Sequence, residues 1–474
     1  MGCKSRFHVD IMDLHDSVTG SCHLLVVTFP DSDDEKLKFV VDCGMFQKEE
    51  EKNENNASFP FNPSGVSFCL ITHAHVDHIG RLPLLAKKGF SGKVYATETT
   101  CKILPEALRD CWRISKSKSK DSGMSMAYDE EDVQTIVYNS VPCQYRAPIK
   151  VHDRIDVYFF RNCHIPGAAC ILVKIKYPGE EDINLFFTGD YNDKNSFQAP
   201  ASIPQWVLDL PITIIQESTY GSTNSDEVVP CFEKNLLEAI RQKKTVLCLV
   251  FSLARAQEIL YFLRRMQDEN KLDVNIPIYF DGKLAIKYTY MYTSGKIDIL
   301  PEMTDFLPDN WTTVDKQVRS ALLEERSCKI ILTSSGTGSY GPARKYIPAL
   351  LSRKDVLMHF TGYTASDTLG GLIQAAPAGG VVNCAGIVAT KYADVQYTSE
   401  FSAHAKADVM IDFLKRFKDL KLVLINHGEP EVKKEFAKRV LDEVDAKSVG
   451  ILSTQTIFRI NAWGVVKTIP TKFL

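Results

Sequence analysis

A short run of metal-binding residue types follows an apolar strand in the first fifth of the chain. The run reads Thr72-His73-Ala74-His75-Val76-Asp77-His78-Ile79-Gly80. Three imidazoles and one carboxylate within six residues are the ligands that a borderline-soft divalent cation prefers. A polar surface turn would leave their position directly after a strand unexplained. The run therefore predicts a metal centre at the edge of a β-sheet.

Other acidic and histidine residues also come directly after apolar strands. Four of them stand in this position: Asp42, His164, Asp190 and His427. An Asp at the end of a strand is often only a turn residue. Side chains at the ends of neighbouring strands, however, converge on one edge of a sheet, which is how α/β scaffolds build their sites. We expect these four residues to join the histidine run.

The pattern of expected elements changes along the chain. Up to about residue 210, short strands are separated by turns, and from Ile212 strands alternate with helices, which favours a parallel-sheet α/β unit. The Lys-rich run Ser115 to Ser125 is expected to be a solvated loop. The expected strands are 38–41, 66–72, 155–160, 185–188, 245–250, 276–280, 329–333, 356–360 and 422–426, and the expected helices are 254–266 and 431–443.

Composition excludes several classes of protein. The 474 residues carry a formal charge of −3, and 45% are hydrophobic and 24% charged, which argues against a disordered, collagenous or membrane-spanning chain. The 13 Cys never form a CxxC pair, so we expect reduced thiols in a cytoplasmic protein rather than a disulfide framework. The near-neutral charge does not by itself support a nucleic-acid partner.

The motifs together resemble a known family. His73-Ala74-His75-Val76-Asp77-His78, with Asp42, His164 and Asp190, is similar to the four metal-site motifs of the metallo-β-lactamase fold. Three further runs resemble the motifs of its β-CASP branch, in the family's order: Gln216-Glu217-Ser218-Thr219-Tyr220-Gly221, Phe401-Ser402-Ala403-His404-Ala405 and Asn426-His427-Gly428-Glu429. The chain is identified as similar to the RNA-processing members of the β-CASP family.

The resemblance implies an α/β fold with two domains. The first is an αββα metallo-β-lactamase sandwich, and the second is an inserted α/β β-CASP domain. The implied boundaries give a first part of the metallo-β-lactamase domain at residues 1–209, the β-CASP domain at 210–396, and a C-terminal completion of the first domain at 397–474.

The resemblance also implies two Zn²⁺ per chain and a role for each site residue. The first ion would be held by His73, His75 and His164, and the second by Asp77, His78 and His427, with Asp190 bridging both. Asp42 would orient a ligand or the shared water. His404 would be the general acid, oriented by Glu217. The implied catalytic residues are Asp42, Asp77, Glu217 and His404.

The residue at the last motif indicates the substrate. The RNA-acting members of this family have a His at this position, whereas DNA-acting members usually carry an apolar residue, so His427 favours RNA. Single-stranded RNA is the expected partner. Ser334, Ser335 and Gly336 follow a strand and are expected to hold the RNA backbone through hydroxyl and N–H donors. Arg255 starts a helix, where a phosphate contact and a salt-bridged structural role are equally expected.

Several alternatives stay open. The two-metal site alone would equally serve a hydrolase of small-molecule esters or thioesters, or a DNA nuclease. A non-catalytic subunit is disfavoured, because the ligands are intact. The run Gly336-Thr337-Gly338-Ser339-Tyr340-Gly341 matches a dinucleotide-binding pattern, but Asp355 precedes a strand where the ribose-binding acid should end one. The motifs do not separate endonuclease from 5′-exonuclease action.

Two further expectations concern parts of the sequence outside the motifs. Five histidines match no metal motif and are interpreted as structural or surface residues: His8, His15, His23, His152 and His359. The motifs begin within the first 45 residues, and the chain stops about 47 residues past His427, which leaves no room for a dedicated RNA-binding module. RNA recognition is therefore expected to come from a homodimer, from a protein partner, or from no separate module.

Overall fold

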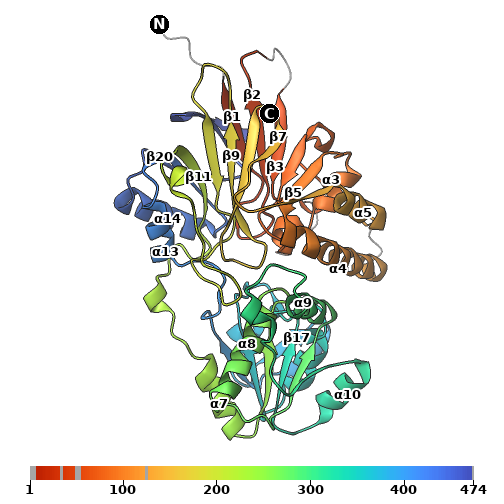
Figure 1. The fold of residues 1–474 in the computed structure, drawn as a ribbon. Helices are drawn as coiled ribbons and strands as arrows, with labels where there is room; N and C mark the ends of the chain where they lie inside the picture. Colours follow the sequence, from red (N-terminus) through yellow and green to blue (C-terminus); the bar gives the residue numbers. More distant parts are fainter. Residues whose placement is uncertain (1–6, 32–35, 48–54, 123–125, 472–474) are drawn as a thin grey trace. The chain divides into compact units, whose positions relative to one another are not determined.

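The computed structural model describes residues 7–31, 36–47, 55–122 and 126–471. Its contacts divide the chain into two compact units (Figure 1). Unit 1 consists of Met1–Ser225 and Ala403–Leu474, and unit 2 consists of Asp226–Ser402. The domain boundaries expected from the sequence, after residues 209 and 396, stay predictions.

Unit 1 contains two β-sheets. The first has eight strands in the order β23-β22-β1-β2-β3-β4-β5-β6. Its antiparallel part joins β1 to β22 and β2, and its parallel part runs from β3 to β6. The bounds of its strands are β1 (His8–Asp13), β2 (His23–Thr28), β3 (Leu37–Val41), β4 (Phe68–Leu70), β5 (Lys93–Thr97), β6 (Ser140–Cys143), β22 (Thr456–Asn461) and β23 (Gly464–Pro470).

The second sheet has seven strands in the order β21-β20-β11-β10-β9-β8-β7. Strands β7 to β10 are antiparallel, whereas β10, β11, β20 and β21 are parallel neighbours. The bounds of its strands are β7 (Ile149–His152), β8 (Ile155–Arg161), β9 (Ala169–Ile175), β10 (Ile183–Phe187), β11 (Pro211–Glu217), β20 (Asp419–Asn426) and β21 (Val449–Ile451).

The two sheets pack face to face through alternating apolar side chains. Val9 and Ile11 of β1 and Val157 and Phe159 of β8 are fully buried in one shared core. Tyr158, between the last two, is only partly buried and packs on the other side of its sheet. Each sheet therefore buries one face against the other, and the removal of this apolar surface from water drives the packing.

Helices cover the outer faces of the sandwich. Helices α13 (Ala407–Leu414) and α14 (Pro430–Glu443) pack on the seven-stranded sheet, where Met410 and Phe436 join its outer core. Helices α4 (Glu98–Ser122) and α5 (Glu130–Asn139) contact β5, and α3 (Leu82–Lys87) contacts α5. In Figure 1 these two groups of helices lie on opposite sides of the strands of unit 1. The predicted αββα sandwich is confirmed.

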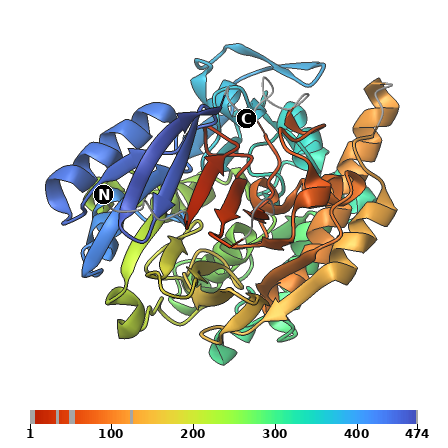
Figure 2. The same ribbon diagram turned by 90° about the horizontal axis from the view of Figure 1, so that it is seen from above.

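The C-terminal segment completes both sheets of unit 1. Strands β20 and β21 extend the seven-stranded sheet beside β11. Strand β22 pairs with β1, so that the blue C-terminal strands lie beside the red N-terminal strands in Figure 2. Short helices connect the strands of unit 1: η1 (Pro63–Gly65), α2 (Val76–Ile79) and α6 (Gln205–Leu208). The two ends of the chain thus belong to one folding unit, although unit 2 lies between them in sequence.

Unit 2 is an α/β unit around a six-stranded parallel sheet of order β14-β13-β15-β12-β16-β19. Its strands are β12 (Thr245–Leu249), β13 (Ile278–Asp281), β14 (Trp311–Thr313), β15 (Lys329–Thr333), β16 (Val356–Phe360) and β19 (Asp394–Tyr397), with a hairpin of β17 (Val381–Cys384) and β18 (Ile387–Thr390). Its helices are η2 (Ser225–Glu227), which spans the boundary, α7 (Phe232–Arg241), α8 (Arg255–Asp268), α9 (Lys283–Thr293), η3 (Pro301–Thr304), α10 (Lys316–Glu324), α11 (Ala343–Leu350) and α12 (Leu369–Ala375). The predicted inserted α/β unit is confirmed.

One predicted loop is wrong. Residues Ser115 to Ser122 continue α4, and residues 123–125 of the predicted loop lie outside the described residues. Ile103, Leu104, Leu108 and Cys111 form a buried stripe at helical spacing. The stripe anchors the helix, and Lys, the residue type that suggested a loop, is a good helix former.

In the described residues, no helix is long and apolar enough to cross a membrane. The cysteines of that part of the chain are free thiols, and most of them are buried. Burial raises the pKa of the Cys248 and Cys101 thiols to about 12, so these side chains stay protonated and act as small apolar residues.

The sandwich core can be tested by one substitution. We expect Phe159→Ala to lower the free energy of unfolding by about 3–5 kcal/mol, because it leaves a cavity between the sheets. Tyr138→Ala is the control, since Tyr138 is 85% exposed and its loss should cost about 0.5 kcal/mol or less. Urea unfolding of both variants measures the difference. Equal losses would contradict the position of Phe159 in the core.

Candidate metal centre

The residues predicted to bind metal all lie in unit 1, at one edge of its two sheets. Strands β3 and β4 are parallel neighbours, as are β10, β11 and β20, so the C-terminal ends within each set lie together. The loops at these ends, and the loop between β8 and β9, carry the candidates: Asp42, His73, His75, Asp77, His78, His164, Asp190 and His427. Loop positions on two packed sheets bring together residues more than 300 positions apart.

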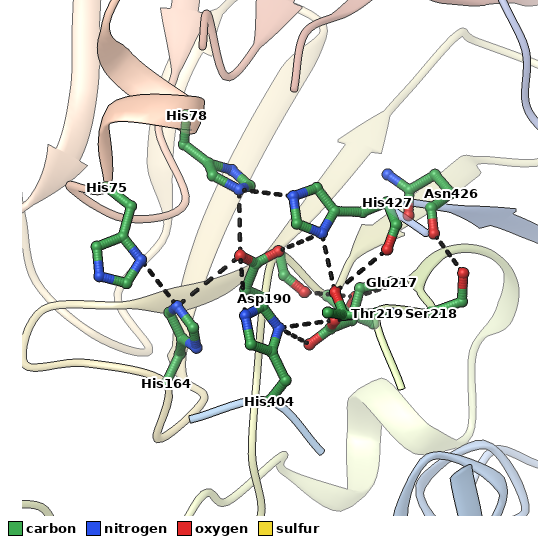
Figure 3. Close-up of polar contacts among 12 residues, drawn as sticks. His75, His78, His164, Asp190, Glu217, Ser218, Thr219, His404, Asn426 and His427 are labelled. Carbon is green, nitrogen blue, oxygen red and sulfur yellow. Dashed lines mark hydrogen bonds and ion pairs between the residues drawn. The ribbon is translucent and has the colours of Figure 1, made fainter. Parts of the chain in front are cut away.

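The first group of ligand atoms comes from three histidines. His75 Nδ1 lies 3.1 Å from His73 Nε2 and 3.0 Å from His164 Nε2 (Figure 3 shows the latter pair). Asp190 Oδ2 lies 3.7 Å from His73 Nε2 and 3.8 Å from His164 Nε2. One ligand atom from each of the four residues lies within 4.8 Å of the others, which is the spacing that a single metal ion requires.

The second group lies on the other side of Asp190. His78 Nε2 is 3.3 Å from His427 Nε2 and 3.2 Å from Asp190 Oδ2. Asp77, in the first turn of α2, joins His78 and His427 within the same 4.8 Å limit. The same carboxylate oxygen of Asp190 therefore faces both groups, as Figure 3 shows for His78 and His164.

The other ring nitrogen of most of these histidines has a partner of its own. His164 Nδ1 donates to the Ala403 carbonyl at 2.9 Å, and His78 Nδ1 lies 2.7 Å from Asp42 Oδ2. His73 Nδ1 lies 3.1 Å from the Thr72 hydroxyl, which itself donates to Asp42. Each of these contacts leaves the Nε2 lone pair directed into the site, which is how metal-binding histidines are oriented.

Two threonines in the site were not predicted. Thr72 contacts Asp42 through both its N–H and its hydroxyl, each at 2.8 Å. Thr219 Oγ1 lies 3.1 Å from His427 Nδ1 and also donates to the His427 carbonyl at 3.2 Å. Thr72 is the first residue of the histidine run, and Thr219 lies within the first β-CASP motif. The signal for both was therefore a hydroxyl inside a motif.

The electrostatics of the site favour neutral imidazoles at three positions. Burial, together with repulsion from neighbouring histidines, holds the pKa of His73, His164 and His427 well below the usual range. His78 behaves differently: burial opposes its charge, but Asp190 and Asp42 outweigh burial and raise its pKa well above the ordinary value. Of these four imidazoles, His78 therefore favours its protonated form, and the other three favour their neutral forms.

These donors fit a pair of divalent cations. His73 Nε2 and His164 Nε2 lie 3.1 and 3.0 Å from the same atom, His75 Nδ1. Imidazole lone pairs at such distances repel one another unless a proton or a cation lies between them. Five imidazole nitrogens and the carboxylates of Asp77 and Asp190 match the nitrogen and oxygen donors of zinc sites. The residues present therefore fit two zinc ions.

A separate pair, His404 and Glu217, lies beside the Asp190 carboxylate. His404 Nδ1 is 3.0 Å from Glu217 Oε2, and His404 Nε2 is 3.9 Å from Asp190 Oδ2 (Figure 3). Glu217 is buried and also accepts from the Tyr191 N–H at 2.8 Å. Burial disfavours a charged His404, but Glu217 and Asp190 outweigh it and raise the pKa of His404 above its ordinary value. The ring can thus hold a proton on the side that faces the metal-binding groups.

The predicted RNA-backbone contacts lie in unit 2 and are not part of this cluster. Ser334 follows β15, and the Ser335 hydroxyl accepts from the Tyr340 N–H at 3.2 Å within the glycine-rich loop that includes Gly336. Arg255 is buried at the start of α8, donates to the Thr361 carbonyl and lies 3.6 Å from Glu258. These contacts anchor Arg255 within unit 2, and substrate binding by all four residues stays a prediction.

The dinucleotide alternative finds no support in the glycine-rich loop. Asp355 directly precedes β16, at the opposite end of that strand from where a ribose-binding carboxylate would lie. Its carboxylate pairs with Arg353 at 2.7 Å. Its position and its ion pair are those of a structural residue.

Three family models match the chain in succession. The model "Metallo-beta-lactamase superfamily" matches residues 19–157, "Beta-Casp domain" matches 256–373, and "Zn-dependent metallo-hydrolase RNA specificity domain" matches 389–449. The chain belongs to the β-CASP family of the metallo-β-lactamase superfamily. The resemblance seen in the sequence motifs is thereby confirmed, and the β-CASP model falls within unit 2.

Curated β-CASP relatives align along most of the chain. Ribonuclease TTHA0252 of Thermus thermophilus is 29% identical over 427 residues, which cover 87% of this chain and 91% of the relative. An RNase J-like protein of Methanocaldococcus jannaschii is 27% identical and covers 89% and 94%. The transcription termination factor FttA of the same organism is 28% identical over 88% of this chain but only 66% of its own length.

Removal of metal should destabilise the protein. We expect dialysis against a chelator to lower the thermal unfolding midpoint and added Zn²⁺ to restore it, because binding to the folded state alone stabilises by about 4 kcal/mol at a thousandfold excess over Kd. Asp190→Ala is the control: it removes the carboxylate shared by both groups, so the chelator should change its midpoint much less. An unchanged midpoint for the unsubstituted protein would argue against a metal centre.

Proposed function

We propose that this β-CASP protein is a zinc-dependent ribonuclease that hydrolyses phosphodiester bonds of single-stranded RNA. The observation that carries the proposal is the His404–Glu217 pair, which sets a proton-bearing imidazole 3.9 Å from the carboxylate that faces both metal-binding groups. An imidazole that carries a proton at this position can protonate the oxygen that leaves when a phosphodiester bond is cleaved.

The distances among the metal-binding residues support the roles proposed for them. His73, His75 and His164 would hold one zinc ion, and Asp77, His78 and His427 would hold the other, with the Asp190 carboxylate close to both groups. When bound, such a pair lowers the pKa of a shared water and neutralises charge on a scissile phosphate. Asp42 and Thr72 fix the orientation of His78 and His73, so that their Nε2 atoms point into the site.

His404 and Glu217 act on the leaving group. Glu217 accepts from the Nδ1 side of the ring and leaves the protonated Nε2 directed at the site, where it donates its proton to the departing oxygen. Tyr191 N–H holds one Glu217 oxygen, which keeps the carboxylate turned towards His404. A carboxylate that orients an imidazole in this way sets its tautomer and favours its charged form.

Comparison with relatives supports RNA as the substrate. Ribonuclease TTHA0252 is named for RNA cleavage and aligns with 87% of the chain, and the model "Zn-dependent metallo-hydrolase RNA specificity domain" covers the segment with His404 and His427. A cytoplasmic location, contacts from Arg255 and Ser334 to Gly336, and a homodimer or protein partner in RNA recognition remain predictions from the sequence.

The role of His404 can be separated from metal binding. We expect His404→Ala to lower the rate of RNA cleavage by about 10²- to 10⁴-fold, because a general acid contributes that factor. Its zinc content should equal that of the unsubstituted protein. His152→Ala is the control, since this histidine lies at the end of β7 and outside the site. Loss of zinc from His404→Ala, or full activity, would contradict the assigned role.

Substrate class and cleavage mode can be measured together. Matched end-labelled single-stranded RNA and DNA are incubated with the protein, with and without chelator, and the products are sized. We expect RNA to be cut only without chelator. Mononucleotides released from the 5′ end would indicate an exonuclease, and internal fragments an endonuclease. Cleavage of DNA alone, or of an ester or thioester substrate but not RNA, would overturn the proposal.

A further inference from the structure

Two histidines that match no metal motif lie directly behind the metal centre. His15 follows β1 and His23 is the first residue of β2, and both are buried. The His15 ring centroid lies 6.0 Å from that of His427 and 5.6 Å from that of His23. The sequence motifs give these two residues no part in the site, whereas the structure places them against one of its ligands.

Asp13, the last residue of β1, faces both histidines. Its Oδ1 lies 2.7 Å from His15 Nδ1 and 3.3 Å from His23 Nδ1, and its carboxylate is fully buried. A buried carboxylate costs several kcal/mol unless polar groups surround it, and such groups more often fix an orientation than add net stability. We therefore expect Asp13 to orient a neighbouring part of the molecule.

A hydrogen bond continues from His23 to the metal centre. The Asn426 side-chain amide donates to His23 Nε2 at 3.0 Å. Because Nε2 accepts this bond, the ring hydrogen of His23 sits on Nδ1, the nitrogen that faces Asp13. Asn426 ends β20 and directly precedes His427. A polar chain thus runs from Asp13, through its 3.3 Å contact with His23, to the hydrogen bond between His23 and Asn426, and ends beside a metal-binding residue.

This polar chain crosses from one sheet to the other. Strands β1 and β2 belong to the eight-stranded sheet, and β20 belongs to the seven-stranded sheet. The surroundings are apolar, with the Phe187 ring 5.8 Å from the ring of His23. The second metal-binding group depends on the same spacing, because His78 follows a strand of the first sheet and His427 a strand of the second. The polar chain bridges the two sheets next to that pair.

The backbone of His427 has a strained conformation that the neighbouring residues must hold in place. Its φ is 44°, in the left-handed region that a residue with a side chain adopts only where its surroundings force it. Ser218 N–H and the Thr219 hydroxyl bind its carbonyl from one side, at 3.3 and 3.2 Å. The His23 bond to Asn426 holds the residue before it from the other side. His427 is therefore held by contacts from both sheets.

We propose that Asp13, His23 and Asn426 form a positioning strut for His427, which sets the affinity of the second metal-binding group without touching the metal. The inference rests on the two-zinc function proposed above. The contacts of the strut lead to His427, whereas His164, the ligand that the seven-stranded sheet gives to the first group, is oriented by the Ala403 carbonyl. Damage to the strut should therefore weaken one zinc ion and leave the other in place.

Two substitutions of His23 test its contact with Asp13 and its contact with Asn426 separately. His23→Asn keeps an amide near the Nδ1 position but loses the group that reaches Asn426, whereas His23→Gln keeps an acceptor near the Nε2 position. We expect His23→Asn to weaken one zinc ion by about 10- to 100-fold, as the loss of outer partners of metal ligands does, and to leave the other unchanged. His23→Gln should stay within a few-fold of the unsubstituted protein. Asn426→Ala breaks the strut from its other end and should repeat the loss.

The measurement is equilibrium dialysis of the full chain against buffers of fixed free Zn²⁺, followed by metal analysis, with thermal unfolding of each metal-free variant to establish folding. Asn184→Ala is the matched control, because Asn184 is a buried amide of the same seven-stranded sheet that donates to the Pro211 carbonyl, and its two zinc affinities should not change. Unchanged affinities in both His23→Asn and Asn426→Ala, equal weakening of both ions, or the same loss in Asn184→Ala would overturn the strut. Fewer than two zinc ions on the unsubstituted protein would overturn the two-zinc function together with the strut. Two zinc ions on the unsubstituted protein, with unchanged affinities in the variants, would overturn the strut alone.

Discussion

The convergence of imidazole lone pairs on one buried carboxylate is the constraint on which the functional part of this structure depends. His75 Nδ1 lies 3.0 Å from His164 Nε2, and His78 Nε2 lies 3.3 Å from His427 Nε2, with Asp190 between the two pairs. Such an arrangement is repulsive unless cations or protons separate the nitrogens. The outer contacts of Asp42, Thr72, Thr219 and Ala403 prevent the rings from turning away. The fold therefore holds the donors in an arrangement that bound cations make favourable.

The sandwich supplies this arrangement because each sheet contributes part of each metal-binding group. The sheets are pressed together by apolar side chains such as Phe159, and the site occupies the edge where that apolar core ends. Backbone strain collects there: Asp42 has a φ of 58° and His427 a φ of 44°. Strained residues persist where their surroundings fix them from several sides. The hydrogen bonds around Asp42 and His427 provide that support. The contacts of the buried Asp13 connect the end of β1 to the same region.

Much of the fold and the centre of the site could be predicted, because their signals are local. The spacing of His73 to His78 lies within one loop, and the apolar runs of β15 and β16 match the observed strands residue for residue. The end of α4 was missed, since its charged residues suggest a loop and only its buried stripe reveals a helix. Strands β22 and β23 were missed as well. Strand β23 is exposed along most of its length, and it forms a strand because it pairs with β22, which pairs with β1 at the other end of the chain.

The sequence by itself determined the chemistry: the types and local spacing of the histidines and carboxylates require a divalent metal, and the order of the motifs identifies the β-CASP family. Only the tertiary structure decided which atoms meet. Glu217 and His404 are 187 positions apart, and only the resemblance of their motifs to those of a family related them beforehand. Asn426 and His23 are 403 positions apart, and the fold alone relates them. The physical reason is that ligand type is a property of single side chains, whereas distances of 3 Å between loops of two sheets depend on how the whole apolar core packs.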